Sequence, residues 1–244
     1  MDDTLLVASV LVANGLTVVQ YDPLDHVGSS DGGMGDYTYS RHCGDLLGVM
    51  RRWAELDPVV MSFGVSALPT LRALVAQPTR GAVLVAPIVA ILRTLVTITG
   101  RDWRAAMRDS GAHASAAVEN EVGAALLRDP ERRDYADEEL LIACASVLTQ
   151  VDVIADEQGG WVDPADIRRL AEVLPNGRVV TVADIEGSAV VSLQFLARAT
   201  AAVLNMMGSD EPFRLPSLTA LRDVWAGSIN CRTTEQRIRS PATG

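Results

Sequence analysis

The stretch of sequence that decides the fold is VVMSFGVSAL, residues 59–68. Its first five residues are apolar or small, and they predict a short buried strand at 59–63. Gly64 then predicts a sharp turn, and a helical run follows over residues 68–76. Ser66 therefore stands at a strand-to-helix turn, two residues after a glycine. This pattern is typical of the elbow that presents a nucleophilic serine above the edge of a parallel sheet.

The elbow position makes Ser66 the candidate nucleophile. The helix N-terminus beneath the hydroxyl favours a developing negative charge, and the Ala67 backbone N–H is the candidate oxyanion donor. The alternative is a serine that only caps the following helix. In enzymes with such an elbow, the catalytic residues follow in the order serine, then aspartate or glutamate, then histidine. The last histidine of this sequence is His113. Because a serine without a base is a poor nucleophile, the motif indicates the origin of the site more firmly than its present activity.

Composition narrows the class of protein. The 244 residues fit one α/β domain, or one domain with an insertion, and a hydrophobic fraction of 48% is ample for a core. The formal net charge is −10, and all 21 basic residues are arginine. The lack of lysine excludes Schiff-base chemistry and lysine-dependent phosphate loops, so the glycine-rich residues 32–35 predict a flexible loop. The acidic balance argues against nucleic acid as a partner.

Neither a targeting segment nor a metal or redox centre is predicted. The apolar run at 82–92 is too short to span a membrane, and the acidic start, Met1 to Asp3, does not resemble a secretory signal, so we expect a cytoplasmic protein. The cysteines have no CxxC spacing and predict buried free thiols, with no metal site and no cofactor. They are Cys43, Cys144 and Cys231.

Hydrophobic spacing predicts strands that alternate with helices, which implies a parallel sheet covered on both faces. The predicted strands are 16–21, 59–63, 82–86, 151–155 and 178–183, and the helices are 5–14, 39–56, 68–76, one starting at 163, and 188–207. The sequence pattern between residues 88 and 148 predicts mostly helices, and we interpret this segment as an inserted cap. The predicted domains are a core of residues 1–87 and 149–207, the helical cap, and a C-terminal tail of 208–244.

Several segments carry a family resemblance. The most specific is the loop at 21–32, YDPLDHVGSSDG, which follows Asn14-Gly15-Leu16. The weaker matches are Leu46, Leu47, Trp53, Gly100, Asp102, Trp103, Trp161, Val162, Asn230, Glu235 and Arg237. Together these segments resemble the bacterial luminescence acyl transferase family, thioesterases of the α/β-hydrolase superfamily that release myristoyl groups from acyl carrier protein.

The resemblance implies an α/β-hydrolase-like sheet and an acyltransferase or thioesterase that acts on acyl carrier protein or acyl-CoA thioesters through Ser66. A second register is open, in which residues 65–67 match the three residues after the family's nucleophile and Gly64 takes its place. The family's triad aspartate corresponds to Gly159, and its histidine falls near Glu186. The triad is therefore degenerate.

Other side chains are candidates for the lost roles. Asp156 follows a predicted strand, near the place of the orienting carboxylate, and Glu186 follows the last strand. We take both as candidate catalytic carboxylates, although acidic loops at strand ends are the alternative. His26 lies in the family-like loop and is a candidate binding residue, with a loop-ordering role as the alternative. His113 is the remaining histidine that a cap can bring over the serine.

This sequence also differs from the family at its N-terminal end, and two other functions are open. The family begins with more strands than this sequence shows, so we expect a sheet whose N-terminal strands are missing, and the options are a longer protein, a rearranged fold or a strand from a partner. Besides an acyl thioester or acyl carrier protein, a second copy of the chain is a possible partner. Two alternative functions stay open. The first is an inactive homologue that binds such a partner, and the second is a lyase or isomerase that uses Asp156, Asp184 or Glu186.

Overall fold

The computed structural model describes residues 3–21, 39–90, 94, 142–156, 162–182 and 193–208. The chain forms two compact units, one of residues 1–20 and 209–244 and one of residues 21–208. Most of the predicted cap and all of the predicted tail except residue 208 lie outside the described residues, so the predicted domain bounds stay a prediction.

The described part of the first unit holds helix α1, Asp3–Ala13, as the sequence predicted. The helix ends at Asn14 and Gly15, where Gly15 has a φ of +83° and the Leu16 N–H donates to the Leu11 carbonyl at 3.1 Å. This is the glycine stop that the sequence indicated. The predicted strand at 16–21 is wrong, because these residues pair with no described strand. An extended segment gains no ladder hydrogen bonds without a neighbour.

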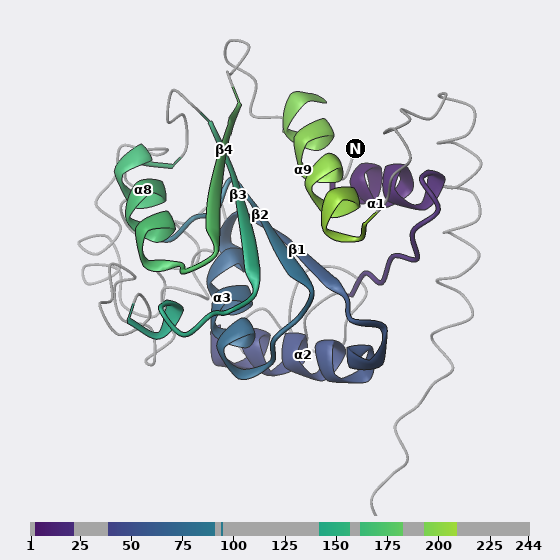
Figure 1. Ribbon diagram of the computed structural model, residues 1–244, viewed down its shortest axis with the longest axis horizontal. Helices are drawn as coiled ribbons and strands as arrows, with labels where there is room; N and C mark the ends of the chain where they lie inside the picture. The colour runs from purple at the N-terminus through teal and green to yellow at the C-terminus, as the bar shows by residue number, and fades with distance from the viewer. Residues whose placement is uncertain are drawn as a thin grey trace, which may run out of the picture. The chain divides into compact units, whose positions relative to one another are not determined.

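Among its described residues, the second unit is built on a parallel sheet of four strands (Figure 1). Its strands are β1 (Val59–Phe63), β2 (Gly81–Val85), β3 (Gln150–Asp156) and β4 (Gly177–Val182), in the order β1-β2-β3-β4. All three pairings are parallel. The four predicted strands in this unit are confirmed, each within about one residue. Every residue of β2 is buried, as expected for a strand inside a parallel sheet.

In the described part of this unit, four bounded helices and two short 3₁₀ turns surround the sheet. They are α2 (Tyr39–Arg52), η2 (Ala54–Leu56), η3 (Gly64–Ser66), α3 (Ala67–Ala76), α8 (Pro164–Val173) and α9 (Leu193–Met206). The start of α8 is the one predicted from Asp163-Pro164, since the Asp163 carboxylate accepts a hydrogen bond from the Ala165 N–H at 2.8 Å.

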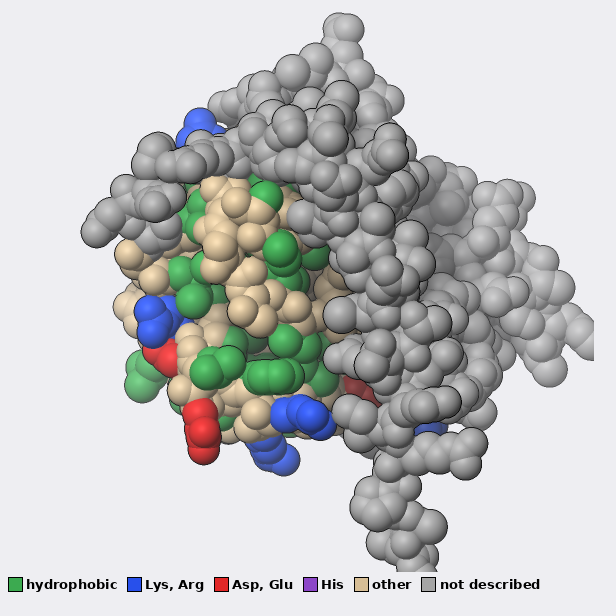
Figure 2. Space-filling model, turned by 90° about the vertical axis from the view of Figure 1, so that its right-hand side faces the viewer, with side chains coloured by type: hydrophobic (Ala, Val, Ile, Leu, Met, Phe, Trp, Pro, Cys, Tyr) green, Lys and Arg blue, Asp and Glu red, His purple; other side chains and the backbone are tan. Residues whose placement is uncertain are grey.

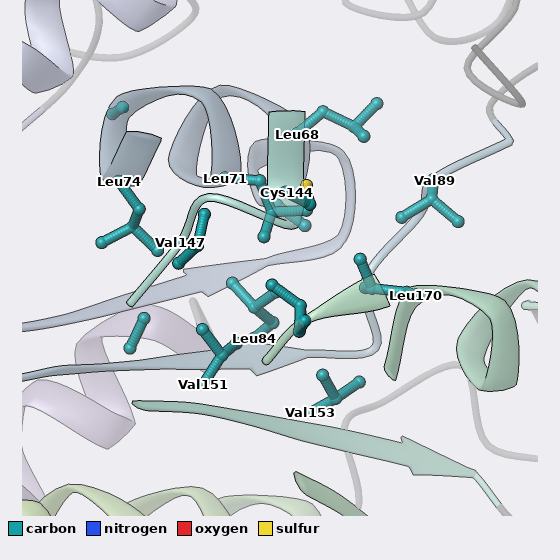
Figure 3. Packing of buried hydrophobic residues seen from close by; sticks show 14 of the residues in the cluster. Leu68, Leu71, Leu74, Leu84, Val89, Cys144, Val147, Val151, Val153 and Leu170 are labelled. Carbon is teal, nitrogen blue, oxygen red and sulfur yellow. The ribbon is translucent and has the colours of Figure 1, made fainter. Parts of the chain in front are cut away.

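The helices cover both faces of the sheet (Figure 1). Helix α3 contacts β1, α2 packs on α3, and α8 contacts β3 and β4, while α9 contacts all four strands from the other face. Figure 3 shows the core on the α3 side, where Leu74 points toward the sheet and Leu68 and Leu71 belong to the same buried cluster. Leu84 and Val151 come from the strands beneath them. This three-layer arrangement confirms the predicted fold class.

Two further expectations are tested in the described residues. Cys43 and Cys144 are buried free thiols, as predicted, and Cys231 lies outside the description. Within the described ranges no helix has the length and apolar character needed to cross a membrane.

Candidate active site

The carboxyl ends of the four strands meet at one edge of the sheet. Gly64 follows β1, Ala86 follows β2, and Asp156 ends β3 opposite Val182 of β4. Because sites in open α/β sheets form beyond this edge, the topology brings the ends of β1 and β3 to the region where a site is expected. Adjacent strands are about 4.8 Å apart, so β1 and β3 are separated by roughly 10 Å.

The turn after β1, residues 63–67, is called here the elbow turn. Its sharpest point is Gly64, which has a φ of +51° directly after the extended Phe63. The Gly64 carbonyl accepts hydrogen bonds from the backbone N–H groups of Ala67 and Ile88, the second at 3.0 Å. The left-handed conformation is accessible to glycine at little cost, whereas an L side chain there is strained.

Ser66 is the last residue of η3 and is half-buried. Its φ of −72° and ψ of −9° are ordinary helical values, and its carbonyl accepts from the Thr70 hydroxyl at 2.8 Å. The Ser66 hydroxyl itself makes no capping hydrogen bond to α3. The alternative reading of this serine as a helix cap therefore has no support in the geometry.

Ala67 is fully buried at the start of α3. Its N–H donates to the Gly64 carbonyl within the elbow turn. To serve as an oxyanion donor, this N–H has to exchange its bond to Gly64 for one to the substrate, so its predicted role needs a rearrangement of the turn.

The remaining candidates are placed only in part. Asp156 ends β3 at the carboxyl edge, but its side chain is not among those described. His26, His113, Asp184 and Glu186 lie outside the described residues. Since roughly 10 Å separates β1 from β3, a carboxylate at residue 156 reaches the elbow turn only through an intervening group. A triad places a histidine in that position.

Sequence reasoning missed one unusual residue at this edge. Ala86 has a φ of +44°, immediately after β2, and its N–H donates to the Ile154 carbonyl at 2.8 Å. A non-glycine residue in this conformation carries strain of about 1–2 kcal/mol. Alanine gives no sequence signal for a left-handed backbone. Residues in such conformations cluster at functional sites, so the edge beside the elbow turn has the character of a site.

In Figure 2, hydrophobic side chains and uncharged atoms fill the middle of the described area, and most of its charged side chains lie near the edge of that area. Among the described residues, no group of three or more His, Cys, Asp and Glu side chains is arranged to hold a metal ion.

Solved structures with the same architecture define the fold. A monoacylglycerol lipase from Paleococcus ferrophilus aligns with a TM-score of 0.59 at 15% identity, over 82% of this chain and 88% of its own. The structure of VinJ aligns with a TM-score of 0.56 at 16% identity, over 85% and 86%. An enol-lactonase from Burkholderia xenovorans LB400 gives 0.55 at 17%, over 84% and 87%. The chain therefore has the α/β-hydrolase fold.

The family match is more specific and covers the elbow turn. Residues 1–86 match the family model described as acyl transferase, a range that contains α1, α2, β1, the elbow turn, α3 and β2. The predicted resemblance is thus confirmed for this part of the chain, and it supports a hydrolase- or acyltransferase-like function. No curated protein matches the chain.

Proposed function

We propose that this protein acts on acyl thioesters, carried by acyl carrier protein or coenzyme A, and that Ser66 accepts the acyl group. The observation that carries the proposal is the position of Ser66. It lies at the carboxyl edge of the sheet, half-buried, with a hydroxyl that does not cap α3, inside the range that matches the acyl transferase family. A hydroxyl in this place lies next to the helix N-terminus, which stabilises developing negative charge.

The proposed reaction follows from this position. The Ser66 oxygen attacks the thioester carbonyl carbon, the carbon–sulfur bond breaks, and the acyl group remains on the serine while the thiol leaves. Water or an alcohol then takes the acyl group. The serine proton needs a base, for which His26, His113 and Glu186 are the proposed groups, with Asp156 as the proposed orienting carboxylate. Carboxylates have reference pKa values far below that of a serine hydroxyl, so a carboxylate base predicts slow turnover.

A second candidate function is binding without turnover, in which the protein holds an acyl carrier or a partner enzyme. The geometry of the elbow turn favours it, because the residue with the left-handed backbone at the sharpest point is Gly64, which has no side chain. The degenerate triad favours it as well, since Gly159 stands where the family has its aspartate.

A fluorophosphonate probe separates the two candidates. If Ser66 is an active nucleophile, the protein is labelled, and Ser66→Ala abolishes the labelling. Ser62→Ala is the matched control, because Ser62 is a buried serine within β1, four residues before Ser66. Well-folded protein that takes no label defeats the first candidate. Binding of acyl-CoA measured by calorimetry, with no turnover, would then support the second.

Turnover that persists in Ser66→Ala has a different meaning. It would exclude an acyl-serine intermediate and point to acid–base chemistry by carboxylates such as Asp156, Asp184 or Glu186. The measurement is the hydrolysis of a medium-chain acyl-CoA by Ser66→Ala, monitored through the free thiol that hydrolysis releases.

A further inference from the structure

We propose that Gly64 occupies the nucleophile position of the elbow, and that a reactive side chain placed at this residue would take up an acyl group. The inference rests on the acyl-ester site of the proposed function, but not on the activity of Ser66. Two alternatives are compared. Either the nucleophile position is residue 64 and holds a glycine, or the nucleophile position is residue 66 and holds the serine.

Backbone conformation is the first argument. In a nucleophile elbow the reactive residue sits on the sharp, strained turn between strand and helix. Here the residue that directly follows β1 and has the left-handed backbone is Gly64, with a φ of +51°, a conformation in which a side chain is strained. Ser66 has ordinary helical angles and already belongs to the first turn that leads into α3. The apex of the turn and the hydroxyl are therefore on different residues.

Space is the second argument. A Cβ atom added at Gly64 would have Ile88 Cδ1 as its nearest neighbour, at 3.7 Å, which is an ordinary van der Waals contact. At Gly177, by contrast, the added Cβ would lie 2.7 Å from Leu174 Cβ. Packing therefore does not demand a glycine at residue 64, and only the positive φ favours one.

Rigidity is the third argument. The Gly64 carbonyl accepts two backbone hydrogen bonds, one from Ala67 within the turn and one from Ile88 after β2. Neither bond involves a side chain at residue 64. These bonds hold the turn in place against the strain that a side chain at the positive φ introduces, and a side chain at its apex has a defined direction.

A thiol tests the position without needing a base from the triad. Cysteine near a helix N-terminus ionises more readily than a free thiol, and the thiolate is the nucleophile. With p-nitrophenyl butyrate, the sulfur of the Gly64→Cys variant attacks the ester carbonyl carbon, the carbon–oxygen bond breaks, and p-nitrophenolate leaves. The product is a butyryl thioester at residue 64.

The experiment compares Gly64→Cys with Ser66→Cys, both combined with Cys231→Ser, and locates the butyryl group by peptide mass spectrometry. Cys43 and Cys144 are buried and serve as internal controls. The helix N-terminus favours ionisation of both thiols, so a difference in rate reports the position on the turn, and we expect the Gly64→Cys thiol to be acylated at least about tenfold faster than the Ser66→Cys thiol at pH 7. Equal rates, or faster acylation of Ser66→Cys, would overturn the proposal.

Gly64→Ala provides the folding control, and we expect it to remain folded with a lower melting temperature because of the positive φ. A Gly64→Cys or Gly64→Ala chain that does not fold would also overturn the proposal, because the geometry leaves room for a side chain. The result is separable from the probe experiment on Ser66. A natural chain that takes no fluorophosphonate label does not change the relative rates of the two thiols.

Discussion

The backbone N–H of Ile88 donates a hydrogen bond to the carbonyl oxygen of Gly64 at 3.0 Å. This bond joins the elbow turn after β1 to the segment after β2. Ala86, two residues before Ile88, has a positive φ and donates its N–H to Ile154 of β3. The carboxyl edge of three adjacent strands is thus tied together by backbone bonds through two residues in left-handed conformations. Substitutions at this edge test that arrangement.

Ala86→Gly is expected to stabilise the protein. Relief of a left-handed alanine is worth about 1–2 kcal/mol, and the extra flexibility of glycine in the unfolded chain offsets about 0.5–1 kcal/mol. The net gain in unfolding free energy should be roughly 0.5–1 kcal/mol, measured by urea denaturation. Ala82→Gly is the control, because Ala82 is buried in β2, without a positive φ, and its loss should destabilise. If both variants lose stability equally, Ala86 is not strained.

Gly177→Ala is expected to destabilise the start of β4. The added Cβ would lie 2.7 Å from Leu174 Cβ and 3.3 Å from the carbonyl oxygens of Ala171 and Leu174. Two of these three contacts are with backbone, so the turn itself must shift, at a cost of about 1–3 kcal/mol.

Gly48→Ala is the matched control for that prediction. Gly48 lies inside α2, is exposed, and has no atom within 4 Å of an added Cβ. Alanine there should stabilise the protein by about 0.5–1 kcal/mol, since glycine weakens a helix interior. Thermal unfolding of the two variants should therefore shift in opposite directions. A lower melting temperature for Gly48→Ala would contradict the description of α2.

Much of the fold could be predicted because apolar runs and turn residues act locally. The strand β1, the turn at Gly64 and the Asp163-Pro164 start of α8 each follow from neighbouring residues. The strand predicted at 16–21 failed because strand formation depends on a partner, and no local pattern shows whether that partner exists.

The site could be predicted in position but not in detail. Spacing placed Ser66 at the strand-to-helix turn, and the family resemblance left two registers for the nucleophile. Only backbone angles distinguish the residues, with the positive φ on Gly64 and helical values on Ser66. The strain at Ala86 was not predictable either, because it arises from how the segment after β2 joins the neighbouring strands.

The pair formed by Asp152 and Arg178 should be important for stability. The Asp152 side chain in β3 is fully buried, and Arg178 of β4 lies directly opposite, with its Nε 3.0 Å from Oδ1. Asp152 raises the pKa of Arg178 through this hydrogen bond and through its charge. Removing the arginine leaves a buried carboxylate without its cation, which is costly.

We therefore expect Arg178→Ala to lower the unfolding free energy by about 2 kcal/mol. This loss is smaller than is usual for a broken buried pair, because the arginine side chain is 57% exposed and water can partly replace it. Arg168→Ala, at an exposed position of α8, should change it by less than about 0.5 kcal/mol. The double variant Asp152→Val with Arg178→Val should recover most of the loss. Urea denaturation at pH 7 measures all three, and an unaffected Arg178→Ala would show that the pair contributes nothing.

Cys144 is expected to make stability fall at high pH. Burial raises the pKa of this thiol from 9.0 to about 11, because the thiolate is poorly solvated in the core. Below pH 9 the thiol is protonated in both the folded and the unfolded chain, and its contribution is fully present. Between pH 9 and about 11 the unfolded chain loses the proton first, so the folded state binds more protons and stability decreases as pH rises.

The size and the control of this effect follow from the same values. A shift of about two pH units corresponds to roughly 2–3 kcal/mol of stability lost by pH 11. Cys144→Ala should remove that part of the pH dependence, although it lowers stability at pH 8 by creating a small cavity. The chain has no lysine, so only its cysteines and its four tyrosines add to the side-chain titration in this range. Urea unfolding of both proteins from pH 8 to 11 gives the comparison, and parallel curves would mean that Cys144 ionises as easily in the folded chain as in the unfolded one.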